Sequence, residues 1–271
     1  MPLSEAAVFS DSVCVLQLTD SHLFADAQQR LLGIDTLASL NAVIDLALQE
    51  CPQIDLVLAT GDIAQDAVTA SYQRFADAVT RIPRACHWIP GNHDDAALMA
   101  ELGREQGLSR SWVDLGAWRI VLLDSSVPGK VSGWLADDQL ARLDEALASA
   151  GQRHILVCLH HHPVPIGSDW MEPLGLGNAD QLFARLDADQ RVRAILWGHI
   201  HQQLEQTRGH MQLLASPSTC VQFAVASSDF ATDNQPPGYR WLRLYDDGRL
   251  ETRVSRLAPG QFLPEAGASG Y

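Results

Sequence analysis

The chain has 271 residues and a mass of 29.6 kDa, which is enough for one domain with a substantial buried core. Acidic residues number 33 against 19 basic ones, so the formal net charge is -14 at pH 7 and we expect no nucleic acid partner. This charge also repels small anions, so a phosphate site in this chain needs local positive charge, most simply from metal ions.

The first half of the chain alternates short apolar runs with helical patterns. Apolar runs typical of strands lie at residues 13–19, 56–60 and 86–89. The helical patterns that follow them cover residues 36–50, 68–79 and 96–106. Because repeated alternation of strand and helix is typical of parallel sheets, this half predicts a largely parallel sheet.

In the second half, strand-like runs follow one another closely, with helical patterns at residues 137–150 and 179–186. The runs lie at residues 112–115, 118–124, 154–159, 193–197, 211–215, 241–245 and 250–254. Turn signals at Gly116, Gly209 and Gly248 separate several of them, so we expect a second, mixed or antiparallel sheet packed on the first. No Pro-rich or Gly/Ser-rich linker interrupts the sequence. This favours a single domain over residues 1–271, with a core at about 13–257 and a short C-terminal tail.

The N-terminal segment lacks the basic start and long apolar stretch of a secretory signal. The longest apolar runs, such as residues 155–159, have five residues, far fewer than a membrane-spanning helix needs. We therefore expect a cytoplasmic protein without a membrane partner, and the sequence leaves its oligomeric state open.

Five polar blocks follow apolar runs directly, where strands are expected to end. They are residues 19–22 (TDSH), 61–62 (GD), 91–94 (GNHD), 160–163 (HHHP) and 198–201 (GHIH). Together they contain seven of the ten histidines. Ligands of α/β sheets bind beyond the carboxyl ends of the strands. Since oxygen and nitrogen donors without cysteine suit hard or borderline divalent metals, the blocks predict a metal site.

The spacing within the blocks has a physical reason. Residues two apart on an extended chain point the same way, so Asp20 with His22, and His199 with His201, are expected to converge on one site. Asp62 follows a glycine, whose flexibility lets the carboxylate reach a position between two ions.

Asn92 can supply a neutral carbonyl oxygen to a metal ion, which leaves the neighbouring His93 free to act as a proton donor. Asp20 and Asp62 bring two negative charges against the four positive charges of two divalent ions. The predicted site therefore keeps a net positive charge that attracts a phosphate group.

Six segments carry a family resemblance that runs from about residue 13 to residue 257. They are LQLTDSHLF (16–24), ATGDIAQD (59–66), WIPGNHD (88–94), LHHHPVPIGSDWM (159–171), GHIHQ (198–202) and SPSTCVQF (216–223). In order and content they resemble the calcineurin-like metallophosphoesterase superfamily, and within it the class III 3′,5′-cyclic AMP phosphodiesterases of bacteria. The resemblance implies an α/β fold, a four-layer αββα sandwich in which two mixed β-sheets are flanked by helices.

The resemblance also implies two divalent metal ions per chain, Fe2+ or Mn2+. One ion takes the side chains of Asp20, His22, Asp62 and His201. The other takes those of Asp62, Asn92, His160 and His199, so that Asp62 bridges the two ions.

In the implied reaction, a hydroxide between the ions attacks the phosphorus of 3′,5′-cyclic AMP, a small-molecule substrate. His93 then protonates the leaving 3′-oxygen, which gives 5′-AMP and lowers the level of a signalling nucleotide. His93 and Asp62 are therefore the expected catalytic residues. The residues expected beside the substrate are His22, Asp62, Asn92, His93 and His201.

Several residues keep two interpretations. His93 is either a general acid or a hydrogen-bond donor to the phosphate without proton transfer. His161 and His162 either support the metal ligands or pack in the core. Asp66 and Asp94 either orient the ligands or cap the helices that follow them.

Two interpretations also remain for three large side chains, and more than one for the activity. Trp170, Met171 and Phe223 either form a wall for the purine base or cover loops without touching a ligand. The activity is alternatively a broader phosphodiesterase for 2′,3′-cyclic nucleotides, glycerophosphodiesters or phosphomonoesters, or a non-catalytic metal-bound nucleotide sensor. The acidic charge argues against a nuclease of the same superfamily.

Overall fold

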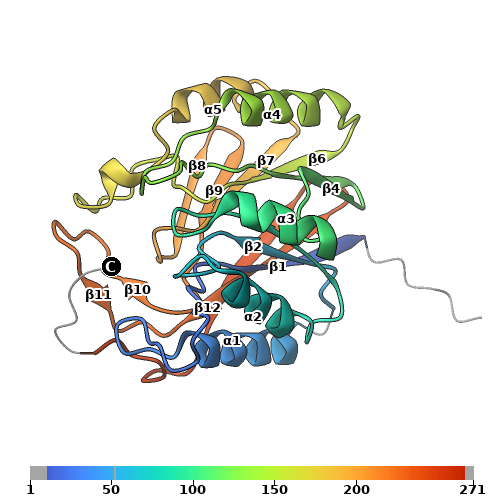
Figure 1. Cartoon of the computed structure of the whole chain (residues 1–271). Coiled ribbons are helices and arrows are strands. Elements are labelled where there is room, and N and C mark those ends of the chain that lie inside the picture. Colours follow the sequence, from blue (N-terminus) through green and yellow to red (C-terminus); the bar gives the residue numbers. More distant parts are fainter. Residues whose placement is uncertain (1–10, 52, 266–271) are drawn as a thin grey trace, which may run out of the picture.

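Two β-sheets lie face to face between two layers of helices (Figure 1). The computed structural model describes residues 11–51 and 53–265. The four-layer αββα sandwich implied by the family resemblance is therefore confirmed. The outer limits of the predicted domain, residues 1 and 271, lie outside the described residues, and its extent stays a prediction.

The first sheet has the order β13-β12-β1-β2-β3. Its strands are β1 (Ser12–Leu18), β2 (Leu56–Thr60), β3 (Ala85–Ile89), β12 (Gly238–Tyr245) and β13 (Leu250–Arg256). Strands β1, β2 and β3 are parallel, as the first half of the sequence predicts. Strands β12 and β13 form an antiparallel hairpin, and β12 pairs antiparallel with β1.

The placement of β12 and β13 corrects the prediction that the late strands belong to the second sheet. β2 pairs with one edge of β1 and leaves the other edge free, and β12 pairs with that edge, where Val15 lies opposite Leu242. Apolar periodicity gives the existence of a strand but not its partner, so sequence order was a poor guide to sheet membership here.

The second sheet has the order β4-β5-β6-β7-β9-β8 and is mixed, as expected. Its strands are β4 (Trp112–Leu115), β5 (Trp118–Leu122), β6 (His154–Cys158), β7 (Val192–Trp197), β8 (Leu204–Arg208) and β9 (Met211–Ala215). The central four strands are parallel, and β4 and β8 are antiparallel edges. The sequence did not predict β8, because this edge strand is exposed along most of its length and lacks apolar alternation.

The helices are α1 (Thr36–Glu50), α2 (Thr69–Val79), α3 (Ala96–Gln106), α4 (Asp137–Ser149), α5 (Ala179–Leu186) and the short 3-10 helix η1 (Glu172–Leu174). Helices α1 and α2 cover the outer face of the first sheet, and α4 and α5 cover that of the second (Figure 1). A two-stranded hairpin, β10 (Gln222–Phe223) with β11 (Thr232–Asp233), lies apart from both sheets.

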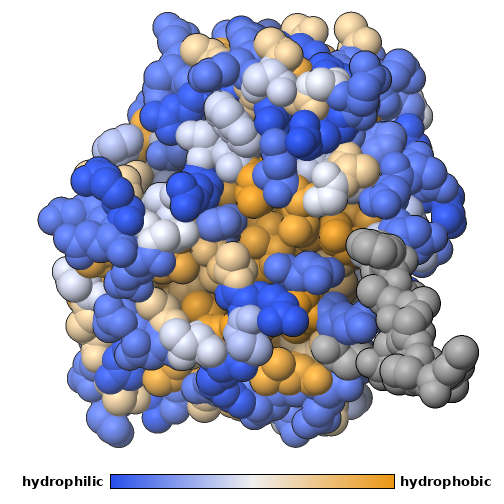
Figure 2. Space-filling view, turned by 90° about the vertical axis from the view of Figure 1, so that its right-hand side faces the viewer, coloured by the Kyte–Doolittle hydropathy of each residue, from blue (hydrophilic) through white to orange (hydrophobic). Residues whose placement is uncertain are grey.

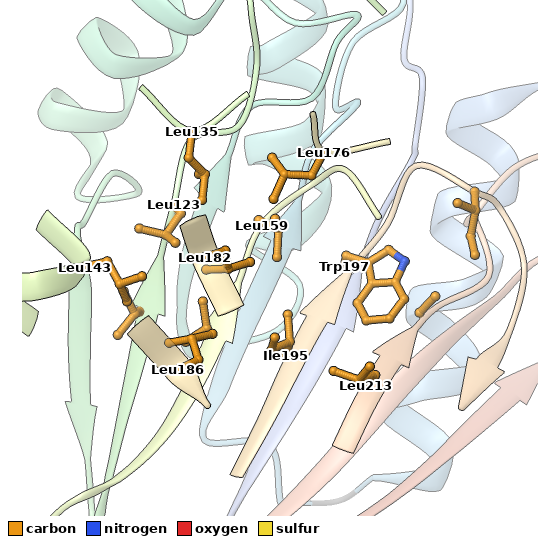
Figure 3. Close-up of a cluster of buried hydrophobic side chains, with 14 of the residues drawn as sticks. Leu123, Leu135, Leu143, Leu159, Leu176, Leu182, Leu186, Ile195, Trp197 and Leu213 are labelled. Atoms are coloured by element: carbon orange, nitrogen blue, oxygen red, sulfur yellow. The ribbon is translucent and has the colours of Figure 1, made fainter. Parts of the chain in front are cut away.

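Apolar side chains fill each space between the layers. The cluster between the sheets includes Val15, Leu58 and Leu156, all fully buried. Beneath α4 and α5, Leu143 and Leu186 lie over the second sheet, as Figure 3 shows. These interfaces fix the position of the two sheets relative to each other, so that the carboxyl ends of strands from both sheets lie close together.

The surface follows the same layering. Figure 2 shows one face on which hydrophilic residues cover the upper and lower parts, while hydrophobic residues gather between them. Within residues 11–51 and 53–265, no helix has both the length and the apolar character needed to cross a bilayer.

Candidate metal centre

The five polar blocks meet at one end of the sandwich. Each follows a strand within a few residues: β1 precedes Asp20, β2 precedes Asp62, β3 precedes Asn92, β6 precedes His160 and β7 precedes His199. Since β1, β2 and β3 are parallel in the first sheet, and β6 and β7 in the second, the carboxyl ends of these strands lie side by side. The blocks thus bring residues from both sheets to one site, as the sequence predicts.

The backbone at five of the candidate metal ligands is left-handed, not extended. Asp20, His22, Asp62, His199 and His201 have φ values of 55°, 46°, 50°, 68° and 50°. The residues do converge, but the expected reason, two residues on one face of an extended chain, is wrong. Non-glycine residues rarely adopt this conformation, and such backbone strain is concentrated at functional sites.

Two glycines permit the close approach of the loops. A Cβ atom on Gly61, whose φ is +99°, would lie 2.3 Å from Nδ1 of His160. A Cβ atom on Gly91 would lie 2.1 Å from Oδ1 of Asp62. Any side chain at these positions would therefore displace a candidate metal ligand.

One cluster consists of Asp20, His22, Asp62 and His201, whose candidate ligand atoms all lie within 4.8 Å of one another. All four side chains are buried. Nε2 of His201 lies 3.4 Å from Oδ1 of Asp20 and 3.2 Å from Nε2 of His22. These four residues match the set expected for the first ion.

A second cluster contains His160, His161 and His199. Nε2 of His160 lies 3.2 Å from Oδ2 of Asp62, and Nε2 of His22 lies 3.8 Å from the same oxygen. Asp62 therefore lies between the two clusters, at the position expected of a bridging carboxylate.

His161 is a cluster member that the predicted ligand set omits. Both of its ring nitrogens already have protein partners, at 2.8 Å from Oγ of Ser125 and 3.0 Å from the carbonyl oxygen of Val131. The ring of His162 stacks on His199 with centroids 5.6 Å apart. Both rings therefore lie against His199, so we infer that the two residues support the candidate ligands.

Each of the four candidate histidine ligands has one ring nitrogen held by a protein oxygen. Nδ1 of His22 pairs with Oε1 of Gln65 at 2.7 Å. The remaining partners are the carbonyl oxygens of Thr60, Leu174 and Val221, which pair with His160, His199 and His201 respectively. A carbonyl or amide oxygen can only accept, so these nitrogens carry a proton and the opposite nitrogen is the one that can bind a metal ion.

The charges at the centre are set by burial and by neighbouring groups. Burial lowers the pKa of His22 and His199 well below the usual range, so both rings are neutral. Burial disfavours ionisation of Asp62, but His160 and His93 outweigh it and hold the pKa of Asp62 well below its usual range. Burial alone would lower the pKa of His160, yet Asp62 and Asp20 raise it to about 9. A divalent ion that binds His160 must therefore displace a proton.

Asn92 gives an independent sign that the residues fit a metal ion. Its Oδ1 atom is buried and has no hydrogen-bond partner among the described residues. A buried, unpaired carbonyl oxygen is costly, and a divalent cation would compensate it. The donor set of carboxylate, imidazole and amide oxygen suits divalent metals, as the sequence predicts.

His93 lies at the rim of the centre. Its ring meets that of His22 edge to face, with centroids 4.9 Å apart, and its backbone N–H donates to Oδ1 of Asp62 at 2.9 Å. Unlike the four candidate histidine ligands, which are buried, His93 is half-buried and therefore accessible from solvent.

Asp94 and Asp66 do not cap helices, so that interpretation is wrong. Asp95 is the residue that caps α3, where its side chain accepts from the N–H groups of Ala97 and Leu98. Asp94 instead accepts from the backbone N–H groups of Gly91, Ile63 and Ala64 and so joins two of the site loops. Asp66 accepts from the N–H of Ala25.

Of the three residues considered as a wall for the purine base, Phe223 packs directly on His201. Phe223 stacks on the His201 ring with centroids 4.1 Å apart and an interplanar angle of 5°. Phe223 and Met171 are buried, and Trp170 packs edge to face on Phe223. Phe223 therefore orients a candidate metal ligand, a role that no sequence pattern indicated.

Known proteins share both the sequence and the fold. Residues 15–203 match the Metallophos family of calcineurin-like phosphoesterases. A 3′,5′-cyclic adenosine monophosphate phosphodiesterase CpdA of Pseudomonas aeruginosa is 52% identical to this chain, and the match covers 96% of each. The protein of the same name from Vibrio vulnificus is 41% identical over 99% of this chain and 98% of its own.

Solved structures with lower identity have the same architecture. A dimetal phosphatase from Danio rerio superposes with a TM-score of 0.63 at 17% identity, over 91% of this chain and 99% of its own. A purple acid phosphatase from yellow lupin gives a TM-score of 0.60 at 15% identity, over 93% of this chain and 53% of its own. These two likenesses show the fold. Taken with the family match and the close relatives, they show that the chain belongs to the calcineurin-like phosphoesterase family.

Proposed function

We propose that this protein hydrolyses 3′,5′-cyclic AMP to 5′-AMP with two divalent metal ions. One observation carries the proposal: buried carboxylates and imidazoles from both sheets converge on two adjacent clusters, with Asp62 between them. The substrate is supported by relatives named as cyclic AMP phosphodiesterases that match nearly the whole chain.

The two ions would be held by seven residues. We assign one ion to Asp20, His22, Asp62 and His201, and the other to Asp62, Asn92, His160 and His199. Fe2+ or Mn2+ is the expected identity, since both bind imidazole and carboxylate groups. When bound, the ions supply charge neutralisation for the phosphodiester and activation of a water molecule.

The chain supplies few negative charges to this site. Of the seven residues, only Asp20 and Asp62 are acidic, and both are buried. Neutral imidazole and amide groups complete the set, so the loaded site keeps the positive charge that an anionic substrate needs.

His93 is the proposed general acid. It lies beside His22 at the accessible rim, where a substrate bound over the centre would meet it. Donation of its proton to the 3′-oxygen would open the cyclic phosphate. The substrate would therefore contact His22, Asp62, Asn92, His93 and His201. We place this activity on a small-molecule substrate in the cytoplasm, without a nucleic acid or membrane partner.

A substrate comparison tests the proposal. Metal-replete protein is assayed with 3′,5′-cyclic AMP, 2′,3′-cyclic AMP, a glycerophosphodiester and bis-p-nitrophenyl phosphate. We expect kcat/KM for 3′,5′-cyclic AMP to exceed that for the other natural esters by about tenfold or more. Equal values for all esters would contradict the proposed substrate, and binding of 3′,5′-cyclic AMP without turnover would indicate a sensor.

A further inference from the structure

A pocket of about 420 Å³ opens beside the candidate metal centre, and His201 forms part of its wall. The rest of the wall comes from the start of β8, the β10–β11 hairpin and the end of β13. This volume lies in the range of small-molecule sites. Because His201 is a candidate metal ligand, this pocket and the metal centre share a wall.

Gln202 presents a hydrogen-bond acceptor to the pocket. Its side chain is 5% exposed, and Nε2 donates to the carbonyl oxygen of Ala224 at 3.1 Å. That bond fixes the amide orientation, since a carbonyl oxygen cannot accept from another carbonyl oxygen. Oε1 of Gln202 has no hydrogen-bond partner within residues 11–51 and 53–265, and it is not sealed from solvent. An acceptor on a buried, oriented side chain therefore faces the pocket.

Arg256 presents donors to the same pocket. Its Nη1 atom donates to Oε1 of Gln222 at 3.1 Å and to the carbonyl oxygen of Pro236 at 2.8 Å. Gln222 is itself held, because its Nε2 donates to the carbonyl oxygen of Ser218 at 2.8 Å. The guanidinium is thus anchored through one nitrogen, and its other nitrogens make no hydrogen bond to the described residues.

The charges of the pocket do not suit a phosphate group. Asp233 lies in the wall with Arg256, and Glu205 pairs with the buried Arg240 at 2.9 Å. Arg256 is therefore the one wall cation among the described lining residues, and acidic groups balance it. A neutral polar group fits this environment better than an anion, which the metal ions would bind instead.

We propose that this pocket receives the purine base of the cyclic nucleotide and that Gln202 and Arg256 select adenine over guanine. The inference rests on the proposed function. The 6-amino group of adenine is a donor that pairs with Oε1 of Gln202, and its ring nitrogens are acceptors for Arg256. Guanine carries an acceptor oxygen at the same position, which would face Oε1 of Gln202 and repel it.

Another cavity, of about 690 Å³, is a weaker candidate for the base. Its wall includes Gly133 and Gly175, which lie directly against the rings of His161 and His162. None of the seven candidate metal ligands is among its described lining residues. The pocket beside His201 therefore shares a wall with the metal centre, whereas this cavity does not.

The decisive variant is Gln202→Leu, which removes the acceptor and keeps the side-chain volume. We expect kcat/KM for cyclic AMP, divided by that for cyclic GMP, to fall about tenfold. The same fall is expected when kcat/KM for cyclic AMP is divided by that for bis-p-nitrophenyl phosphate, which has no base. Gln212→Leu is the matched control, because Gln212 also donates to a backbone carbonyl but lies outside the pocket. This control should keep both wild-type ratios.

Arg256→Met provides a second test, with Arg253→Met on the same strand as its control. Calorimetric titration of metal-replete protein with 5′-AMP and 5′-GMP measures base selection without turnover. We expect Arg256→Met to weaken 5′-AMP binding about tenfold, and Gln202→Leu to abolish the preference over 5′-GMP. Metal content measured on each variant shows that the centre is intact.

The outcomes separate the two proposals. Equal losses for all three esters, or wild-type ratios in Gln202→Leu, would overturn the base pocket while cyclic AMP hydrolysis by the wild type still stands. Wild-type protein that cleaves bis-p-nitrophenyl phosphate but not cyclic AMP would overturn the proposed function, and the adenine pocket with it.

Discussion

Nε2 of His22 lies 3.2 Å from Nε2 of His201, and the Nδ1 atom of each ring is held by a protein oxygen. Both Nε2 atoms therefore present lone pairs to each other in a buried space. Two facing acceptors repel unless a cation or a proton lies between them. This relationship explains why bound metal is expected to stabilise the fold as well as to support activity.

Removal of metal should lower the melting temperature. Ligand at about 100 times its Kd stabilises the folded state by about 2.7 kcal/mol. For a chain of this size, loss of this stabilisation on treatment with a strong chelator lowers the melting temperature by about 5–10 °C. Differential scanning calorimetry of chelated and Mn2+-restored samples measures the shift. An unchanged melting temperature, with metal loss verified by elemental analysis, would contradict a metal site at these residues.

Asp62→Ala should remove metal and activity together, because the carboxylate lies between the two clusters. Loss of supporting residues alone costs about 10–100-fold in metal affinity or activity, so loss of the bridge should cost more than about 100-fold in kcat/KM. Asp45→Ala is a control on an exposed carboxylate of α1 that pairs with Arg81. Full metal occupancy in Asp62→Ala would show that Asp62 does not bridge two ions.

His93→Ala should keep both metals and lose turnover of cyclic AMP by about 10²–10⁴-fold. The leaving group separates its two interpretations. A general acid matters for the poor alkoxide leaving group of cyclic AMP and much less for p-nitrophenolate, which leaves without a proton. Similar losses for both esters would assign His93 to phosphate binding only, and an emptied metal site would show that it is a structural residue.

Gln65→Ala should weaken metal binding about 10–100-fold, because Gln65 holds Nδ1 of His22 at 2.7 Å. Gln65→Glu keeps an acceptor oxygen for the same nitrogen and should restore most of the affinity. Titration of metal-depleted protein with Mn2+ measures both variants. Wild-type affinity in Gln65→Ala would contradict an orienting role.

The sequence predicted the layers of the fold and the place of the polar blocks, but not which strands pair with each other. The five polar blocks could be found because they directly follow apolar strands, a pattern that depends only on local order, and the family resemblance then named the seven candidate ligands within them. Strand pairing depends on which edges remain free, so the position of β12 beside β1 could not be predicted. Strand β8 lacks apolar alternation because it lies exposed at a sheet edge.

Other features of the site have no sequence signal at all. The oxygens that orient His160, His199 and His201 are backbone carbonyls, which every residue carries. The left-handed backbone of Asp20 and Asp62 lies in the loops that follow β1 and β2, and residue type gives little indication of it. Such details become visible only when the chain is folded.

Cyclic AMP hydrolysis by metal-depleted and metal-restored protein shows whether the candidate metal centre carries the activity. Protein is stripped with a chelator, then assayed before and after addition of Mn2+ or Fe2+, and the nucleotide product is identified by chromatography. We expect negligible turnover without metal and rapid, metal-dependent release of 5′-AMP after restoration. Unchanged turnover in stripped protein, or no turnover of cyclic AMP with both metals bound, would contradict the proposed function.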